Sequence, residues 1–505
     1  MNSQEKGVTG RQLLVTAFVS GAAVMMIEIS AARLLAPYFG TSIFIWTNII
    51  GVVLIALSAG YYIGGRMADR RPDPRILFSI IAAAGVIGMV IPWVVRPVAR
   101  YLTLDALLFQ SGSFFIFFSS FIVSLVIFAV PLGLLGIVSP FIIKLHAAED
   151  RVGESSGIVF AISTIGSIVG TYLPTLWLIP TFGTNATVMS AGALLVAVAF
   201  WYVLRSATAK VAVTLSAFIL VSLASGAGIR RTSATLYEGE SAYQYIRVQE
   251  TADGARQLMY NEGISFQSEW HPERILTGYY YDYYQTLPLL FDRDRDLNVL
   301  ILGLAGGTIS RQLYNFYGDR VRVDGVEIDK KVLDVAYTYF DLSQPNLSVY
   351  EDDGVVYLMR TNKKYDIIII DAYQNQYYIP WTMTTIEFWK MVTEKLSPNG
   401  IVAMNVVGGP SSLLPRAIMN TQTRVFDHVF ALRAGRDNLN MMVIASDSSL
   451  NFGTLRGESA VPELEQIANT IADSVQLIQF DPDGLILTND KAPVEFLTDS
   501  ILFGL

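Results

Sequence analysis

The sequence predicts a multi-pass α-helical membrane domain followed by a small β unit and an α/β Rossmann-like domain. Long apolar runs fill residues 1–231, β-rich segments occupy residues 232–290, and residues 291–505 alternate strands and helices around a glycine-rich turn. Apolar stretches of ~20 residues suffice to cross a bilayer, and the strand–turn–helix–strand order is typical of a parallel sheet. We therefore expect three domains with these boundaries.

The composition supports membrane helices and argues against several other classes. Hydrophobic residues make up 52% of the 505 residues and charged residues only 16%, whereas soluble domains usually carry about 25% charged residues. The mean hydropathy is +0.42. The formal net charge of -8 gives no support to nucleic-acid binding. Cys is absent, and the three His (His146, His271 and His428) lie far apart, so no disulfide and no metal site is expected.

Apolar runs in the first domain predict seven or eight membrane-spanning helices. The runs are Leu13–Ala36, Ile43–Gly64, Ile76–Val95, Phe114–Leu145, Ile158–Leu178, Ala186–Leu204 and Val211–Ser225. The fourth run is too long for one straight span, and Pro131 and Pro140 interrupt it. It therefore forms either two spans or one kinked span.

The charges leave open which side of the membrane the C-terminal half faces. Lys and Arg gather in short cytoplasmic loops, and here they follow the second, fourth and sixth runs. If the fourth run crosses once, these loops share one side with the N-terminus, and the C-terminal half lies outside. Arg230 and Arg231, after the last run, favour the inside. An even number of spans would divide the charged loops between the two sides.

Two ionisable residues, Glu28 and Arg33, lie within or at the end of the first run. Ionisable groups in a membrane span are costly, so they are functional candidates by default. The alternative is a structural ion pair, or an Arg whose head group extends to the membrane surface. The sequence does not decide between these roles.

Residues 232–290 are predicted to form a small β-hairpin domain. Tyr245–Glu250 and Arg256–Tyr260 have the composition of strands, and Asp253-Gly254 lies between them. This pattern is typical of a hairpin with a short turn.

A glycine-rich turn opens the C-terminal domain. The strand Asn298–Leu302 precedes the turn Gly303–Thr308, and Ile309–Tyr317 is helical. Glycines let the backbone pass close to a ligand, and the helix N-terminus offers free N–H groups. The next strand, Val321–Ile328, carries Glu327. An acid about 20 residues after such a turn can accept hydrogen bonds from ribose hydroxyls.

Two further strands are also followed by acidic residues at their carboxyl ends, which form one rim of the predicted sheet. Leu347–Tyr350 leads to Asp353, and the apolar strand Tyr365–Ile370 ends at Asp371. Ligands bind at the carboxyl ends of strands in open α/β sheets. Together with Glu327, these acids therefore predict a nucleoside site, in which Asp353 contacts the adenine amino group. The alternative is that Asp353 and Asp371 are turn or cap residues.

These residues resemble the polyamine aminopropyltransferases (spermidine synthases), and in particular their membrane-fused branch. The similar segments in the C-terminal half are Ser241–Gln244, Tyr280–Leu289, Leu302–Leu313, Val326–Asp329, Asp353-Gly354, Tyr365–Asp371, Ile379-Pro380, Thr384–Phe388 and Leu487–Val494. Those in the N-terminal half are Ile27-Glu28, Arg33–Gly40, Gly64–Arg70 and Ile162–Thr171. The resemblance thus covers nearly the whole chain.

The resemblance implies a class I S-adenosylmethionine-type fold and a specific reaction. An aminopropyl group would move from decarboxylated S-adenosylmethionine to an amine acceptor such as putrescine, and methylthioadenosine would be released. Asp371 matches the catalytic base of the family. The implied nucleoside contacts are Gln244, Gly303, Glu327 and Asp353, and the implied substrate contacts are Tyr280, Asp282 and Tyr373. Such a reaction needs orientation and proton removal but no metal.

Two positions depart from the family pattern. Gly306 stands where the glycine turn of the family carries an acid, and Gln374 replaces a second acid three residues after Asp371. These acids hold cationic amines in the soluble enzymes, and each charged hydrogen bond contributes roughly 1.5–3 kcal/mol. We therefore expect weaker diamine binding. The tyrosines in Tyr279–Tyr284 and Tyr373–Tyr378 suit an amine or aromatic cage, or equally ordinary packing.

Two other functions stay open. One is an S-adenosylmethionine-dependent methyltransferase, and the other is a non-enzymatic, nucleoside-regulated membrane transporter or sensor in which Glu28 is central. As partners we expect a small-molecule amine acceptor, the lipid bilayer and, in a homodimer, a second copy of the chain. Because S-adenosyl nucleosides are cytosolic, we expect a multi-pass protein of the cell membrane whose soluble domain is cytoplasmic.

Overall fold

The computed structural model divides the chain into two compact units, which are described separately. The described residues are 8–39, 43–108, 112–147, 151–203, 232–261, 263, 265–374, 377–436, 439–457 and 462–503. The first unit comprises Met1–Thr232 with Glu238–Tyr245, and the second comprises Ser233–Tyr237 with Ile246–Leu505.

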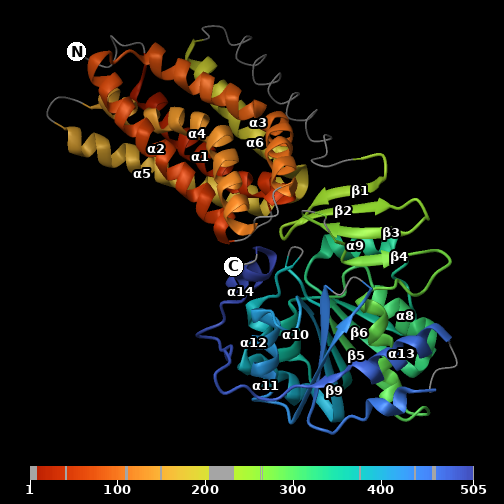
Figure 1. Cartoon of the computed structure of the whole chain (residues 1–505). Coiled ribbons are helices and arrows are strands. Elements are labelled where there is room, and N and C mark those ends of the chain that lie inside the picture. The colour runs from red at the N-terminus through yellow and green to blue at the C-terminus, as the bar shows by residue number, and fades with distance from the viewer. Residues whose placement is uncertain are drawn as a thin grey trace. The chain divides into compact units, whose positions relative to one another are not determined.

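The first unit consists of long apolar helices (Figure 1). They are α1 (Gly10–Phe39), α2 (Ile43–Arg70), α3 (Pro74–Leu108), α4 (Gly112–His146), α5 (Val152–Leu173) and α6 (Ile179–Val203), and the π-helical turn η1 (Pro174–Leu178) joins the last two. Within the described residues, five helical stretches are long and apolar enough to cross a membrane, judged by length and composition. One of them, Val152–Tyr202, contains both α5 and α6.

Six of the seven predicted apolar runs correspond to helices α1 to α6. The fourth run, for which two spans or one kinked span were expected, forms the single helix α4, which contains Pro131 and Pro140. The seventh run, Val211–Ser225, lies outside the described residues. The total of seven or eight spans therefore stays a prediction.

Glycines allow helices α2 and α4 to pack closely. A Cβ atom built on Gly60 of α2 would lie 2.2 Å from the carbonyl oxygen of Gly133 and 2.8 Å from the Cα of Gly136, both on α4. Nothing lies within 4 Å of a Cβ built on Gly51 of the same helix. Small residues at such contacts let helix backbones approach each other. Gly60 is therefore required by packing, whereas Gly51 is not.

We expect Gly60→Ala to lower the thermal stability of the helical unit and Gly51→Ala to leave it unchanged or slightly higher. Overpacking a tight contact costs about 1–3 kcal/mol, while Ala has the higher helix propensity. Thermal unfolding of both purified variants, followed by circular dichroism, provides the comparison. Equal midpoints for the two variants would contradict the close α2–α4 contact.

The two ionisable residues of α1 have different surroundings. Arg33 donates a hydrogen bond to the carbonyl oxygen of Ala242, which belongs to the same compact unit. A structural role of Arg33 is therefore supported. Glu28 is half-buried, and among the described residues it has no hydrogen-bond or ion-pair partner.

A four-stranded sheet follows the helices, in the order β1-β2-β3-β4. Its strands are β1 (Thr235–Glu240), β2 (Tyr245–Glu250), β3 (Arg256–Tyr260) and β4 (Ser268–Trp270). Strands β2 and β3 pair antiparallel, and Gly254 between them has a φ of 87°. The predicted hairpin at Asp253-Gly254 is confirmed.

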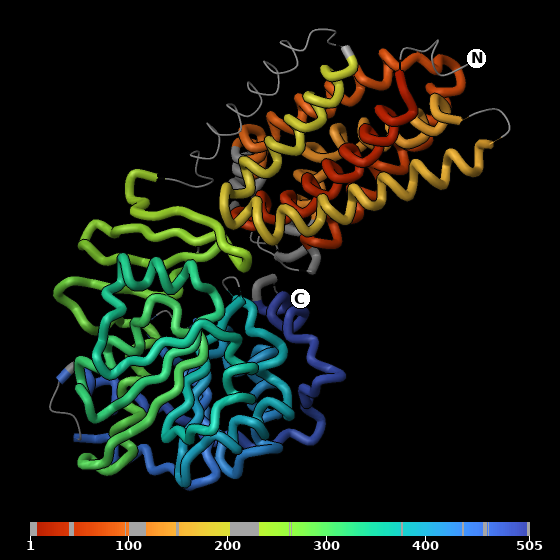
Figure 2. Tube along the Cα trace, turned by 180° about the vertical axis from the view of Figure 1, so that it is seen from behind, coloured from red at the N-terminus to blue at the C-terminus, as the bar shows by residue number. Residues whose placement is uncertain are grey.

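An eight-stranded sheet forms the centre of the C-terminal domain, in the order β12-β10-β11-β9-β8-β5-β6-β7. The strands are β5 (Leu297–Leu302), β6 (Val321–Glu327), β7 (Leu347–Glu351), β8 (Tyr365–Ile370), β9 (Leu396–Val407), β10 (His428–Ala434), β11 (Asn440–Ser446) and β12 (Gln476–Leu477). Strands β7, β6, β5, β8 and β9 run parallel, and β11 joins β9 antiparallel. Figure 2 shows the Cα trace of this domain from the side opposite to Figure 1. The predicted Rossmann-like fold is confirmed.

Helices cover both faces of this sheet, as expected for buried parallel strands. On one face lie α10 (Gly354–Arg360), α11 (Ile386–Lys395), α12 (Leu413–Gln422) and α14 (Val494–Phe503), which contribute to one apolar core. The other core includes α8 (Thr308–Tyr317), α9 (Lys330–Tyr339), α13 (Pro462–Ser474) and the 3₁₀ segment η2 (Tyr280–Leu290). The candidate site therefore lies at the carboxyl ends of the parallel strands, which the helices on the two faces do not cover.

Candidate functional site

The glycine turn after β5 requires glycine at its first position. Gly303 has a φ of 90°, and a Cβ there would lie 2.5 Å from the carbonyl oxygen of Asp371. The backbone N–H groups of Gly303 and Leu304 both donate to the carbonyl oxygen of Val326, at 3.0 Å. Gly307, with a φ of 79°, begins helix α8. The turn is thus held directly between the ends of β6 and β8.

Glu327 ends β6 next to this turn. Its carboxylate accepts hydrogen bonds from the N–H of Ala305, at 3.0 Å, and from the N–H of Asp329, at 3.1 Å. Burial raises the pKa of Glu327 to about 7. Asp329 itself caps α9 by accepting a hydrogen bond from the N–H of Lys331. Glu327, rather than Asp329, is therefore the carboxylate tied to the glycine turn.

Asp353 both caps a helix and keeps a free oxygen. Its Oδ1 accepts hydrogen bonds from the N–H groups of Val355, at 2.8 Å, and Val356, at 3.0 Å, at the start of α10. Among the described residues, no partner contacts Oδ2, and the side chain is half-buried. The helix-cap role is confirmed for one oxygen, and the other remains available to a ligand.

Asp371, after β8, is held by two hydrogen bonds. Its Oδ2 accepts from the hydroxyl of Tyr280 at 3.1 Å, and its Oδ1 accepts from Nδ2 of Asn405 at 3.0 Å. The Oδ1 of Asn405 in turn accepts from Nδ2 of Asn440 at 2.8 Å. Burial raises the pKa of Asp371 to about 7, although both hydrogen bonds oppose this shift. A carboxylate with such a pKa can exchange a proton near neutral pH.

Asn405 and Asn440 were not identified from the sequence. Asn405 interrupts the apolar second half of strand β9, residues 401–407, and it is buried with 2% of its surface exposed. A polar residue at the end of an apolar central strand is the signal that could have pointed to it. Asn440 carries no comparable signal, because it is the first residue of β11.

A small cavity of about 60 Å³ lies beside Asp371. The residues that line it are Ser265, Phe266, Gln267, Tyr279, Tyr280, Tyr281, Tyr373, Tyr377, Asn405, Val407, Leu439 and Asn440. Both hydrogen-bond donors to Asp371, Tyr280 and Asn405, are among them. Tyr373 donates to the carbonyl oxygen of Asn405 at 3.0 Å. Two of the predicted substrate residues, Tyr280 and Tyr373, are therefore brought together at one cavity.

Asp282, the third predicted substrate residue, does not line this cavity. Its carboxylate is 2% exposed and accepts hydrogen bonds from the N–H groups of Thr277 and Gly278, from the hydroxyl of Thr277 and from Nε2 of Gln312. These donors belong to the segment before η2 and to α8. Asp282 thus fixes the start of the tyrosine-rich segment rather than facing the cavity.

Gln244, the remaining predicted nucleoside contact, lies in the other compact unit from the rim residues. It is buried just before β2, and its N–H donates to Oγ of Ser241 at 3.0 Å. Its predicted contact with a nucleoside stays a prediction.

The structure gives a physical reason for the glycine at position 306. Gly306 donates its N–H to Oγ of Ser268 at 2.8 Å, and a Cβ on Gly306 would lie 2.7 Å from the Cβ of Ser268. An acidic side chain has no room there. Gln374 is exposed, and its backbone pairs with Tyr378 in an isolated bridge. Neither position supplies a second carboxylate.

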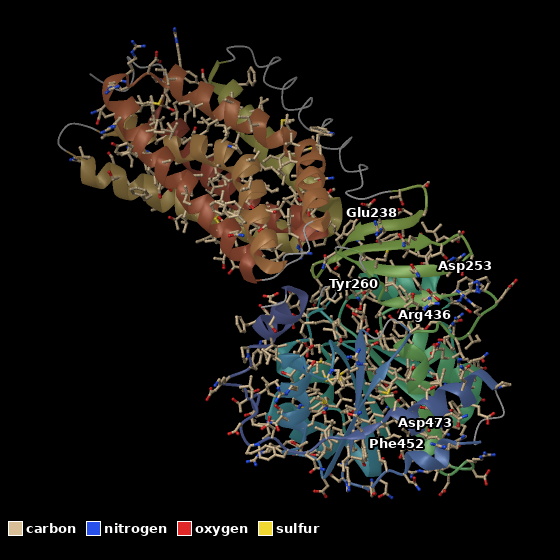
Figure 3. The ribbon with its side chains drawn as sticks, in the orientation of Figure 1. Glu238, Asp253, Tyr260, Arg436, Phe452 and Asp473 are labelled. Atoms are coloured by element: carbon tan, nitrogen blue, oxygen red, sulfur yellow. The ribbon has the colours of Figure 1, made fainter. Side chains whose placement is uncertain are left out.

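Arg436, which is labelled in Figure 3, lies in the turn between β10 and β11. Its guanidinium carbon is 4.4 Å from the centre of the Tyr279 ring, and Nη2 donates to the Tyr279 hydroxyl at 2.9 Å. The charged side chain that contacts the cavity wall here is therefore a cation.

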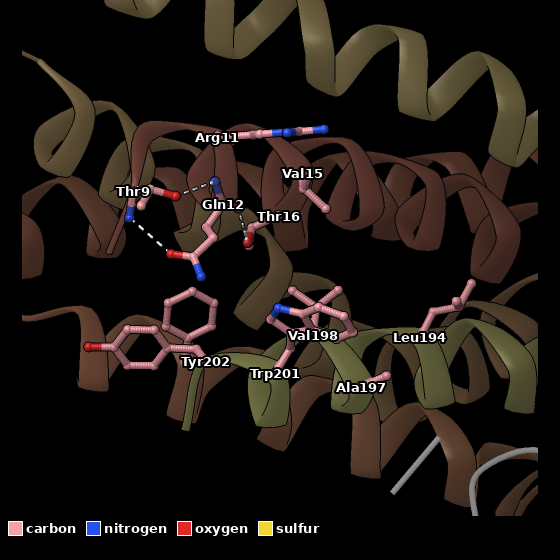
Figure 4. Close-up of a pocket in the computed structure, with 11 residues that line it drawn as sticks. Thr9, Arg11, Gln12, Val15, Thr16, Leu194, Ala197, Val198, Trp201 and Tyr202 are labelled. Carbon is pink, nitrogen blue, oxygen red and sulfur yellow. Dashed lines mark hydrogen bonds between the residues drawn. The ribbon is translucent and has the colours of Figure 1, made fainter. Parts of the chain in front are cut away.

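A second, larger cavity of about 430 Å³ lies in the helical unit, where residues of α1 face residues of α6 (Figure 4). It is lined by Thr9, Arg11, Gln12, Val15, Thr16, Phe78, Leu194, Ala197, Val198, Trp201 and Tyr202. The described residues of this mostly apolar lining include no Asp, Glu or His. Within the described residues, no three His, Cys, Asp or Glu gather as metal ligands. The rim of the C-terminal sheet is therefore the candidate site for acid–base chemistry.

The parallel strand order, with a glycine turn after β5, places the C-terminal domain in the class of Rossmann-like α/β domains. Residues 280–435 match the spermine/spermidine synthase domain family. This match lies within the C-terminal half of the chain.

Two curated relatives and one solved structure illustrate the similarity. A "probable polyamine aminopropyl transferase" of Bifidobacterium longum is 34% identical over 281 residues, which are 52% of this chain and 61% of that protein. "Polyamine aminopropyltransferase 2" of Aquifex aeolicus is 22% identical over 405 residues, 76% of each chain. A probable spermidine synthase from Corynebacterium glutamicum has a TM-score of 0.39 and 18% identity, and the match covers 51% of this chain and 98% of that one.

Proposed function

We propose that the protein is a membrane-bound aminopropyltransferase that uses decarboxylated S-adenosylmethionine, transfers its aminopropyl group to an amine, and releases methylthioadenosine. The observation that supports this most is Asp371, whose carboxylate has a pKa of about 7 and is hydrogen-bonded by Tyr280 and Asn405, two residues that line the cavity. It directly adjoins the glycine turn, since its carbonyl oxygen approaches Gly303. The match of residues 280–435 to the spermine/spermidine synthase domain supports the same reaction.

In the proposed reaction, the lone pair of a neutral amine attacks the methylene carbon next to the sulfonium. The carbon–sulfur bond breaks, and its electron pair stays on sulfur, which becomes the neutral thioether of methylthioadenosine. Asp371 takes the proton from the attacking nitrogen, while Tyr280 and Asn405 fix the orientation of the carboxylate. A base with a pKa near the working pH is the efficient choice for such a proton transfer.

The remaining rim residues would hold the nucleoside. Glu327 is placed to accept hydrogen bonds from the ribose hydroxyls, and the free Oδ2 of Asp353 from the adenine amino group. The turn at Gly303 lets the backbone pass close to the nucleoside, and Gln244 is proposed as a further contact. Because S-adenosyl nucleosides are cytosolic, we place the domain on the cytoplasmic side of the membrane. A homodimer is the proposed assembly.

The nucleoside product distinguishes this function from the alternatives. Purified protein is incubated with decarboxylated or ordinary S-adenosylmethionine and a mixture of amines, and the products are identified by mass. We expect methylthioadenosine from the decarboxylated nucleoside only. S-adenosylhomocysteine would instead identify a methyltransferase. Calorimetric binding of the nucleoside without any turnover would overturn the enzymatic proposal and favour a nucleoside-regulated sensor or transporter.

A further inference from the structure

Half of the residues that line the cavity beside Asp371 are aromatic. They pack against each other: the ring centres of Phe266 and Tyr279 are 4.8 Å apart, and those of Tyr280 and Tyr281 are 4.1 Å apart. Aromatic faces attract a single cation and also pack well against apolar groups. The wall is therefore suited to an amine that carries an apolar body.

The hydroxyl groups of these tyrosines are already used within the protein. Tyr280 donates to Asp371, Tyr281 donates to the carbonyl oxygen of Phe266, and Tyr373 donates to the carbonyl oxygen of Asn405. Burial, followed by the charge of Asp371, raises the pKa of all three phenols well above the usual range. The phenols stay neutral, so they provide no negative charge for a second ammonium group.

The charges around the cavity also favour one cation rather than two. The described residues that line it include no Asp, Glu, Lys or Arg. Asp371 contacts the lining residues Tyr280 and Asn405, and the charged group that contacts the lining residue Tyr279 is the guanidinium of Arg436. A second ammonium group near Tyr279 would meet a like charge, which is unfavourable.

We propose that the acceptor is a primary amine with one cationic end and an aromatic or aliphatic tail, rather than a diamine. This proposal rests on the proposed function, because it names the substrate class of the same site. The amine would lie at Asp371, and the tail would pack against the aromatic wall. The described lining residues offer no carboxylate to the second ammonium of a diamine, and a charged hydrogen bond there would contribute roughly 1.5–3 kcal/mol.

The test compares one diamine with two monoamines as acceptors. Methylthioadenosine formation from decarboxylated S-adenosylmethionine is measured with putrescine, pentylamine and phenethylamine. In pentylamine a methyl group replaces the second ammonium of putrescine. We expect kcat/KM for both monoamines to exceed that for putrescine at least about tenfold, which corresponds to roughly 1.4 kcal/mol. A higher kcat/KM for putrescine would overturn the proposal.

A variant at the cavity edge tests the electrostatic cause. Leu439 lines the cavity and is 57% exposed, so a longer polar side chain can be accommodated. Leu439→Glu adds a carboxylate, and Leu439→Gln is the uncharged control of equal length. We expect only Leu439→Glu to shift the kcat/KM ratio of putrescine to pentylamine toward the diamine, by about tenfold. If the ratio is the same in both variants, a missing second carboxylate is not the reason for the preference for monoamines.

The two proposals fail in different ways. Methylthioadenosine formed with putrescine as the preferred acceptor overturns only the inferred substrate class. No methylthioadenosine with any of the three amines, in protein that binds the decarboxylated nucleoside by calorimetry, overturns the proposed function itself.

Discussion

Asp371→Asn is expected to reduce kcat/KM for methylthioadenosine formation by roughly 10²–10⁴-fold, the usual contribution of a positioned general base. The amide keeps the size of the carboxylate and one acceptor for Tyr280 or Asn405, but it cannot take a proton from the amine. In the wild-type protein, the rate should rise with pH around a midpoint near 7, where Asp371 ionises. The midpoint should be absent from the residual rate of the variant.

The pH dependence of thermal stability shows whether Asp371→Asn loses activity because the base is missing or because the protein no longer folds. Burial raises the pKa of Asp371 from 3.8 to about 7 in the folded protein. The folded state then binds the proton more tightly than the unfolded state, so the wild-type protein loses stability as pH rises through this interval. Asn carries no such penalty. The variant should unfold at a higher temperature than wild type above pH 7, with the difference vanishing near pH 3.8.

Calorimetric titration with decarboxylated S-adenosylmethionine provides the control for Asp371→Asn. Nucleoside affinity should stay close to that of the wild type, because Asp371 is assigned to the amine and not to the nucleoside. An unchanged turnover rate in the variant would remove Asp371 from the mechanism.

Glu327→Gln is expected to weaken nucleoside binding by roughly 10- to 100-fold. Both carboxylate oxygens accept backbone hydrogen bonds, from Ala305 and from Asp329. An amide has one acceptor only, so its NH₂ group must face an N–H donor, and its ability to accept from ribose hydroxyls falls as well. Hydrogen bonds to a charged group contribute about 1.5–3 kcal/mol, and about 1.4 kcal/mol corresponds to a factor of ten in affinity.

Glu351→Gln is the matched control for Glu327→Gln. Glu351 pairs with Glu327 in the register of β6 and β7, but its side chain is exposed. Titration calorimetry of both variants should show weaker binding only for Glu327→Gln. Equal losses in the two variants would point to a general effect of charge at this rim, and no loss in either would remove Glu327 from the nucleoside site.

Local sequence patterns predicted the main features of the α/β domain well. Strand Tyr365–Ile370 was recognisable because it ends in four consecutive Ile residues, and the structure buries all of its residues between two helical layers. The strand ends then follow from the rule that parallel strands present their carboxyl ends at one rim. This is why Glu327 and Asp371 could be identified as candidates without coordinates.

Features that depend on packing between distant segments were not predictable in the same way. The Asn440–Asn405–Asp371 chain arises because β11 inserts beside β9 in antiparallel register, and the sequence does not specify that pairing. Asp282 lies within a matching family segment, yet local hydrogen bonds to Thr277 and Gly278 occupy it. The closeness of Asp282 to Tyr280 in the sequence could not show whether Asp282 contacts the substrate or holds the start of the tyrosine-rich segment.

The most direct test of aminopropyl transfer follows the aminopropyl group itself. Decarboxylated S-adenosylmethionine is labelled with deuterium in its aminopropyl chain and incubated with the full-length protein and pentylamine, and both products are analysed by mass. The account predicts that the deuterium appears in the amine product and that methylthioadenosine is unlabelled. Deuterium that stays with the nucleoside, while the amine gains only an unlabelled methyl group, would contradict it.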